Sequence, residues 1–297
     1  QNQSVMKMVV DKNWTITFAI PDHEWPAISE GAKVRISMIT ITRHSVDSKR
    51  IVYAPDHHQV ANRSRKHDAD GLAPVYTIRF CRHITPELTS GVSISQFNKL
   101  KANDGIDSAG VKPYSRQLVL THDKLNEIIG ENEYIGQITP IYVNGDDVSR
   151  GDFSSRVLDF DGWKEDEIRQ NLPELYQYLY DYVRPRRLQE RNPRLRQFWW
   201  LFEANREPLR RALLGIDRYI CTPENSAQRY FVFLPSPILP DQKLRVIAHD
   251  DAWVHGVLSS TIHIHFSALA GGRAGVANTP VYNSRCFDCF PFPDPSD

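Results

Sequence analysis

The chain changes its hydrophobic periodicity twice, and this change constrains its fold more than any other feature of the sequence. The early segments Thr15–Ile20 and Val34–Ile41 are rich in β-branched residues and bounded by turn residues, which is typical of strands. From Asp161 the apolar residues recur at helical spacing, as they do through Leu172–Val183. After Gly215 short apolar runs return between turns rich in proline and aspartate. These changes predict an α+β fold.

The same patterns give individual elements. Strands are expected at Thr15–Ile20, Val34–Ile41, Val75–Phe80, Gln117–Thr121, Ile138–Val143, Tyr230–Leu234, Leu244–Ala248 and Val257–Phe266. Helices are expected at Gln96–Ala102, His122–Ile129, Leu172–Val183, Leu195–Leu201 and Pro208–Leu214. Pro173 argues against one unbroken helix in its window, and Pro185 is expected to end that element. The polar stretch Arg43–Ala73 is expected to be an irregular, exposed excursion.

The composition is that of an ordinary globular protein, with 41% hydrophobic and 24% charged residues. No apolar run approaches the roughly 18 residues that a membrane helix needs, and no signal peptide is recognisable. Four cysteines in 297 residues do not form a disulfide framework, so a reducing cytoplasm is the expected location. Because the chain begins with Gln1 rather than methionine, we expect it to be a piece of something longer.

The net charge of zero initially argues against a nucleic-acid partner, but the distribution of the charge weakens that objection. The basic residues are 25 arginines and 11 lysines, and arginine suits bidentate contacts to phosphate and guanine. Between Arg184 and Arg218 the chain carries ten arginines and only four acidic residues. A local basic face, rather than the total charge, is what binding to DNA requires.

Several catalytic signatures are absent. The sequence contains neither Asn-Pro-Pro-Tyr nor Asp-Pro-Pro-Tyr, and no glycine-rich cofactor turn follows an N-terminal strand. The glycines of Gly271–Gly275 fit a flexible hairpin loop better than a phosphate cradle. Asp241-Gln-Lys243 matches half of a nuclease motif, but no suitably spaced Pro-Asp precedes it. The sequence therefore predicts no catalytic residue.

The histidines and late cysteines leave a metal site open as a lesser alternative. Cys286-Phe-Asp-Cys289 has the spacing of a zinc half-site, but a structural zinc needs four ligands. His263 and His265 would share one face of the expected strand, where they could contact phosphate, bind a metal or hydrogen-bond to neighbours. The simpler interpretation is a pair of buried thiols and two structural histidines, with no metal.

The strongest positive signal is a run of arginines followed by aromatic residues. Basic and aromatic side chains in alternation are typical of a nucleic-acid-binding face. The competing interpretation is a helix with solvated arginines whose tryptophans belong to the core. The run consists of Arg184, Arg186, Arg187, Arg191, Arg194, Arg196 and Phe198-Trp-Trp200.

A series of short motifs, in order along nearly the whole chain, resembles one family. The motifs are Trp25, Gly31–Met38, Phe97–Leu100, Asn103–Ile106, Gly110–Pro113, Leu118–Thr121, Asn144–Asp147, Val157–Phe160, Arg184–Arg186, Phe198–Trp200, Arg206, Leu258–Ser260, His263, Tyr282 and Cys286–Pro293. Together they resemble the C-terminal target recognition region of MmeI-type (type IIG) restriction–modification enzymes, which include a class I adenine-N6 DNA methyltransferase.

The resemblance implies a division of labour within a longer bacterial protein. Residues 1–90 would be the β-rich end of a methyltransferase core, and residues 91–297 a mixed α/β target recognition domain. This chain would hold and select double-stranded DNA, while a catalytic domain of the same polypeptide would flip and methylate the adenine. S-adenosylmethionine would bind in that parent enzyme and not in this chain, and no membrane partner is implied.

Candidate DNA contacts follow from this interpretation. Phosphate contacts are expected from Arg184, Arg186, Arg187, Arg191, Arg194 and Arg196, because guanidinium groups suit phosphate. Base contacts are expected from the late polar residues Lys243, Arg273, Asn278 and Asn283. Two alternatives remain open: a stand-alone DNA specificity subunit, and a metal-dependent hydrolase that uses His263, His265 and the late cysteines.

Overall fold

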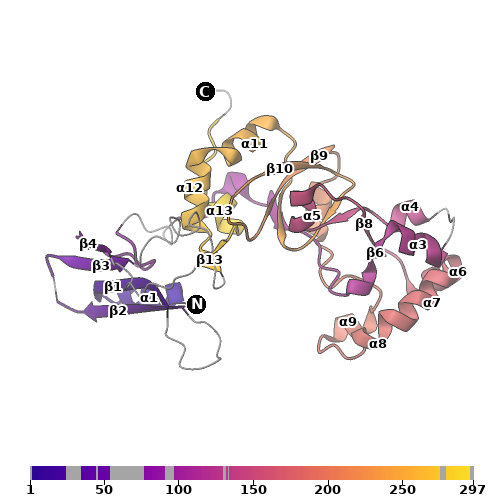
Figure 1. Cartoon of the computed structure of the whole chain (residues 1–297), viewed down its shortest axis with the longest axis horizontal. Coiled ribbons are helices and arrows are strands. Elements are labelled where there is room, and N and C mark those ends of the chain that lie inside the picture. The colour runs from indigo at the N-terminus through magenta and orange to yellow at the C-terminus, as the bar shows by residue number, and fades with distance from the viewer. Residues whose placement is uncertain are drawn as a thin grey trace, which may run out of the picture. The chain divides into compact units, whose positions relative to one another are not determined.

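The computed structural model describes residues 2–24, 35–44, 46–53, 77–90, 97–129, 132, 134–274 and 279–294. The chain divides into two compact units, the first spanning Gln1–Asn98 and the second consisting of Lys99–Ala274 with Thr279–Asp297. Both units combine helices with sheets (Figure 1), which confirms the predicted α+β class. Within the described ranges no helix is long and apolar enough to cross a membrane.

Among the described residues, the first unit consists of a four-stranded sheet with one helix. Its strands pair in the order β2-β1-β3-β4, with β1 parallel to β3 and antiparallel to β2. Ile16 and Ala19 of β1 are both buried although they are three residues apart, because the pairing with β2 shifts register between Ile16 and Phe18. The elements are α1 (Asn2–Asp11), β1 (Thr15–Glu24), β2 (Arg35–Thr42), β3 (Lys49–Tyr53) and β4 (Thr77–Cys81).

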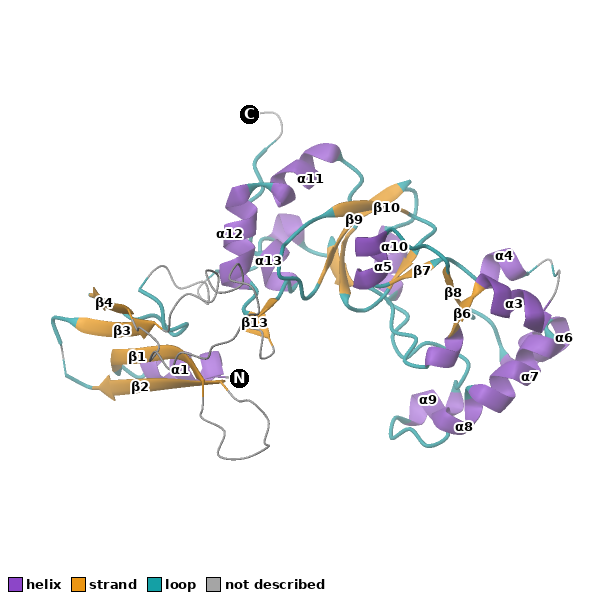
Figure 2. Cartoon of the chain, in the orientation of Figure 1, coloured by secondary structure: helices purple, strands orange, loops and turns teal. Residues whose placement is uncertain are grey.

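The second unit has strands at its centre and helices at both ends (Figure 2). In its described residues the largest sheet has the order β10-β9-β12-β5, and three two-stranded sheets pair β11 with β7, β6 with β8 and β13 with β14. The strands are β5 (Asp107–Ala109), β6 (Val119–Thr121), β7 (Tyr142–Val143), β8 (Ser155–Val157), β9 (Arg218–Pro223), β10 (Val232–Pro235), β11 (Leu239–Pro240), β12 (Leu244–Ile247), β13 (Arg273–Ala274) and β14 (Thr279–Pro280).

The helices of the second unit fall into three groups. One group packs around a large apolar core that contains Leu175, Leu179, Trp199 and Trp200, a second lies beside the central sheet, and a third follows β12. They are η2 (Lys101–Asn103), η3 (Arg116–Leu118), α3 (His122–Ile129), α4 (Ile135–Ile138), α5 (Gly145–Arg150), α6 (Glu165–Asn171), α7 (Pro173–Tyr182), α8 (Arg184–Arg187), α9 (Pro193–Gln197), α10 (Glu207–Ala212), α11 (Ala252–Ser259), α12 (Thr261–Ala270) and α13 (Ser284–Asp288).

Proline positions explain the helix breaks in the arginine-rich part of the second unit. Pro173 stands in the first turn of α7, which covers most of the expected helix Leu172–Val183, and the separate helix α6 ends just before it at Asn171. Pro185 was predicted to end the helical element, and α7 does end before it, at Tyr182. Pro185 itself belongs to the next helix. It lies in the first turn of α8, where its missing N–H would have no intrahelical partner.

The prediction of a strand at Val257–Phe266 is wrong, because this segment belongs to α11 and α12. Ser260 starts α12, and its hydroxyl accepts a hydrogen bond from the N–H of His263 at 3.3 Å. The buried positions in α12 are His263, Ser267 and Ala270, which recur at helical spacing. The alternation of apolar residues therefore does not reflect a sheet.

Three smaller expectations need correction. The helix expected at Gln96–Ala102 is reduced to the 3-10 turn η2 in the described residues. The strand expected at Ile138–Val143 begins as the end of α4, and only Tyr142–Val143 pairs as a strand. The irregular excursion expected from Arg43 contains β3, while residues 54–76 lie outside the described ranges.

Candidate nucleic-acid interface

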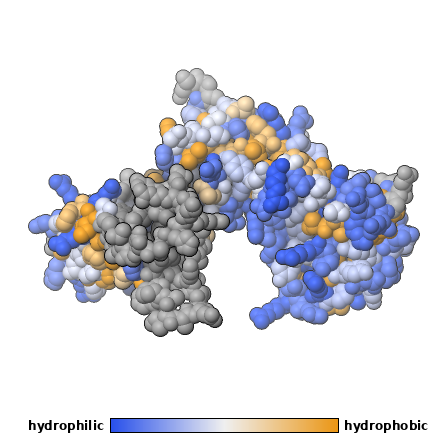
Figure 3. Space-filling model, viewed as in Figure 1, coloured by the Kyte–Doolittle hydropathy of each residue, from blue (hydrophilic) through white to orange (hydrophobic). Residues whose placement is uncertain are grey.

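The run of arginines lies on α8, α9 and the turn between them. Asn192 caps α9, since its side chain accepts the N–H of Arg194, and Pro193 fits the first turn. Arg186 and Arg191 are exposed, and neither guanidinium group has a hydrogen bond or ion pair with a described residue. Arg184 is half-buried and stacks over the ring of Tyr180 at 4.7 Å. Figure 3 shows a mainly hydrophilic surface over this part of the second unit.

Two further arginines are exposed but held by backbone carbonyls. Arg194 Nη1 donates to the carbonyls of Phe202 and Glu203, both at 3.2 Å. Arg196 Nη1 donates to the carbonyls of Glu190 and Arg191, at 2.7 and 3.1 Å. These bonds restrict the rotamers of both side chains. A contact to a ligand would therefore cost less side-chain entropy than it would for an arginine with a freely rotating side chain.

Arg187 does not belong to this exposed set, and its predicted contact with phosphate is corrected here. Its side chain is 1% exposed. Its Nη2 donates to the carbonyls of Pro113 and Leu201, at 2.7 and 3.0 Å. Burial also lowers the pKa of the guanidinium, because the charged form loses solvation. Arg187 thus links two loops in the protein interior through its hydrogen bonds.

The tryptophans are part of the core rather than a stacking platform. Trp199 and Trp200 are 3% and 6% exposed, and Trp200 Nε1 donates to the carbonyl of Trp163 at 3.1 Å. Trp199 also makes edge-on contacts with the rings of Tyr176 and Tyr180. The competing interpretation, in which the tryptophans belong to the core, is therefore correct for Trp199 and Trp200.

The expected base contacts have different surroundings. Lys243 is exposed in the turn before β12, and Arg273 is exposed on β13. Asn278 lies outside the described residues. Asn283 caps α13 by accepting the N–H of Arg285 at 3.0 Å, and it donates through Nδ2 to the carbonyl of Gly271 at 2.9 Å. Both functional ends of Asn283 are therefore occupied by the protein's own backbone.

The second unit places these residues at separate locations. The arginines of α8 and α9 are at the end of the unit that contains α3, α6 and α7, whereas β13 lies at the opposite end beside α12 and α13 (Figure 1). A ligand that contacts both groups would have to extend along the unit. A duplex has that extended form, and a compact metabolite does not.

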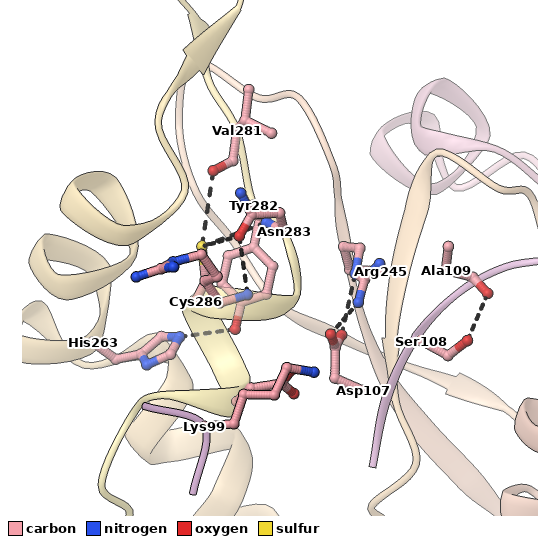
Figure 4. Close-up of polar contacts among 12 residues, drawn as sticks. Lys99, Asp107, Ser108, Ala109, Arg245, His263, Val281, Tyr282, Asn283 and Cys286 are labelled. Carbon is pink, nitrogen blue, oxygen red and sulfur yellow. Dashed lines mark hydrogen bonds and ion pairs between the residues drawn. The ribbon is translucent and has the colours of Figure 1, made fainter. Parts of the chain in front are cut away.

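Polar side chains meet around His263 and Tyr282 in the interior of the second unit (Figure 4). His263 Nε2 and the hydroxyl of Tyr282 are 3.0 Å apart, and His263 Nδ1 has no partner among the described atoms. Burial, assisted by the charge of Arg229, lowers the pKa of His263 to about 4. Asp107, whose side chain is buried, forms an ion pair with the partly buried Arg245. His263 and Tyr282 are both among the sequence motifs, but the sequence does not indicate that they contact each other, because they are distant along the chain.

The geometry separates the groups that a metal site would need. His263 is buried and His265 is exposed, so the two do not share a face as the strand prediction required. Cys286 and Cys289 are buried, and burial raises the pKa of Cys286 to about 11. Among the residues that the structure describes, no cluster of three histidine, cysteine, aspartate or glutamate side chains could hold a metal ion. The hydrolase alternative thus loses its proposed histidine pair.

Comparison with known proteins gives information on the fold. No family model matches the chain, and no curated protein matches its sequence. Among solved structures, the type IIL restriction–modification enzyme MmeI, determined in complex with DNA, matches over 99% of this chain with a TM-score of 0.75 at 19% identity. This chain has the fold of part of MmeI. The resemblance expected from the motifs is thereby confirmed at the level of the fold.

The chain corresponds to only part of MmeI. The chain spans 37% of the length of MmeI, so most of MmeI has no counterpart in it. The type IIG restriction endonuclease BpuSI also matches over 99% of the chain, at 12% identity, but its TM-score is 0.34, which is too low to support a conclusion.

Proposed function

We propose that this chain recognises the sequence of double-stranded DNA within a restriction–modification enzyme. The observation that carries the proposal is the likeness to MmeI, which extends over 99% of the chain and concerns a protein determined in complex with DNA. The second unit adds an exposed set of arginines, Arg186, Arg191, Arg194 and Arg196, on α8, α9 and the turn between them.

The arginine set suits a phosphate backbone for an electrostatic reason. Each phosphate that a guanidinium neutralises releases condensed counterions, and this release favours binding independently of sequence. Arg194 and Arg196 are already held by carbonyl groups, so they present their charge with little further ordering. These contacts would set the register of the duplex but would not select its sequence.

Sequence selection is assigned to the exposed side chains of Lys243 and Arg273. Arginine and lysine both pair with the O6 and N7 acceptors of guanine in the major groove. Asn283 is removed from the set because its side chain bonds to the backbone at both ends. Asn278 keeps its predicted role, which the described residues do not address.

The finer part of the proposal concerns adenine-N6 methylation. Methylation of a base inside a duplex requires that the base leave the stack. This chain has no Asn-Pro-Pro-Tyr or Asp-Pro-Pro-Tyr tetrapeptide, so we assign flipping and methyl transfer to a catalytic domain elsewhere in the same polypeptide. S-adenosylmethionine would supply the methyl group there, and no residue of this chain is assigned to it. A stand-alone specificity subunit remains the alternative.

The proposal is tested by removing the two exposed arginines that have no partner among the described residues. In the double variant Arg186→Ala/Arg191→Ala, the slope of log K against log salt should fall by about 2, since each lost phosphate contact contributes about 0.9. Fluorescence anisotropy with a labelled duplex measures this slope. Affinity should fall for every duplex sequence alike, because phosphate contacts carry no sequence information.

The matched control keeps the charge. The variant Arg186→Lys/Arg191→Lys should retain most of the salt slope, because lysine also neutralises phosphate. An alanine variant whose salt slope and affinity equal those of the unaltered chain would show that α8 and α9 are not the phosphate-contacting surface.

A further inference from the structure

The hairpin formed by β13 and β14 is attached to the rest of the second unit by its second arm. β14 pairs with β13 on one side, through Arg273 with Pro280 and Ala274 with Thr279. On the other side the N–H of Ser226 donates to the carbonyl of Pro280 at 3.3 Å. β14 is therefore bonded on both sides, to Ser226 and to β13. β13 carries the exposed side chain of Arg273.

The base of the hairpin is tightly packed. A Cβ atom added at Gly271 would lie 1.7 Å from the carbonyl oxygen of Val281, so the two arms approach as only glycine permits. The N–H of Tyr282 donates to the carbonyl of Glu224 at 2.7 Å, and its side chain is fully buried against His263. Figure 4 shows Cys286 beside Val281 and Asn283 in this region.

One side chain joins the hairpin to the central sheet. Arg229 Nη1 donates to Thr222 Oγ1 at 2.9 Å and to the carbonyl of Pro223, at the end of β9. Its Nη2 donates to the carbonyls of Glu224 and Pro280, both at 3.3 Å. The guanidinium also lies over the ring of Tyr282, 5.2 Å from the centroid.

The partners of Arg229 are unusual for a half-buried cation. All four hydrogen-bond acceptors are neutral, and burial lowers the pKa of the guanidinium. No carboxylate of the described residues forms an ion pair with it. A side chain that only balanced charge would be placed beside an acid. The planar fork of arginine instead fixes three backbone carbonyls and a hydroxyl in one geometry.

We infer that Arg229 is a positioning residue for sequence recognition, because it sets the orientation of the β13–β14 hairpin relative to β9. This inference rests on the proposed function, since it concerns how the hairpin presents Arg273 to base edges. Arg229 itself does not contact DNA. A bidentate contact to guanine is sensitive to small displacements, so an unfixed hairpin discriminates poorly between bases.

The test uses Arg229→Lys, which keeps the charge but cannot bond to all four acceptors. Short duplexes with a randomised centre are selected on the full chain and sequenced, and enrichment is compared between variants. Selectivity at one or more base pairs should fall about tenfold, equivalent to about 1.4 kcal/mol. The salt slope of binding should stay unchanged, because no phosphate contact is lost. Amide hydrogen exchange at Ser226 and Val281 should become faster.

The matched control is Arg218→Lys at the opposite end of β9. Arg218 donates to the carbonyl of Asp250 at 3.1 Å and stacks on Phe233 at 3.9 Å. Its replacement should leave both selectivity and hairpin exchange unchanged. If Arg229→Lys enriches the same sequences to the same degree as the unaltered chain, the positioning role is wrong while the proposed function stands. If the unaltered chain binds no duplex, both fail.

Discussion

Arginine has two distinct roles in the second unit, and burial separates them. Arg186 and Arg191 are exposed, and their guanidinium groups have no partner in the described structure, whereas Arg187, next to Arg186 in the chain, is 1% exposed and bonds to two carbonyls. A count of arginines in the sequence cannot distinguish these roles. At the residue scale, the distinction depends on which side of α8 each position occupies.

The structural role of Arg187 predicts a large effect on stability. Arg187→Ala should lower the free energy of unfolding by about 2–4 kcal/mol, since it opens a cavity and leaves the carbonyls of Pro113 and Leu201 without their donor. Arg186→Ala should change it by less than about 0.5 kcal/mol, as an exposed substitution does. Urea denaturation of both variants measures the difference. Equal midpoints would contradict the assignment of Arg187 to the interior.

His263 predicts a pH dependence of stability. Its pKa in the folded chain is about 4, below the ordinary value of 6.5, so between these values the unfolded chain binds more protons than the folded one. The stability associated with the neutral histidine is fully present above pH 6.5 and is lost as the pH falls toward 4. The loss is about 3 kcal/mol at most, from about 1.36 kcal/mol per pKa unit.

The measurement compares the unaltered chain with His263→Gln by denaturation at several pH values. The difference between the two free energies of unfolding should change through the window from about 6.5 to about 4, because only the unaltered chain carries the titrating group. Parallel curves for the two proteins over this window would rule out His263 as a buried neutral histidine.

At the scale of elements, the sequence predicted those structures whose signals are local. The helix at His122–Ile129 was predicted with its bounds, and the hydroxyl of Thr121 accepts the N–H of Lys124 at 3.3 Å as a cap does. β1 and β2 also lie where their β-branched residues placed them. In both cases the residues that determine the element are adjacent in the chain.

The failures involve interactions that are not local. The segment Val257–Phe266 alternates like a strand, but the partners of its buried side chains are Tyr282 and the aromatic residues near the C-terminus, which helical spacing brings together. The hydrogen bonds of Arg229 and the pair of Asp107 with Arg245 join residues from different strands and loops. No spacing rule in a single sequence indicates such contacts.

At the scale of the whole molecule, the candidate interface has two parts within the second unit. In our proposal the arginines of α8 and α9 contact a phosphate backbone, and the β13–β14 hairpin carries Arg273 at the other end of the unit. Sequence predicted Arg186, Arg191 and Arg273 as candidates from residue type alone, but it could not indicate Arg229. The fold, shared with part of MmeI at 19% identity, depends on packing that short motifs only partly represent.

The most direct measurement is competition between a duplex selected by the unaltered chain and a shuffled duplex of the same composition, at a fixed salt concentration. A sequence-recognition module should prefer the selected duplex by at least about 10³-fold, the lower end of the range for specific DNA-binding proteins. Equal affinity for the two duplexes would contradict the account, because it would leave only the contacts to phosphate.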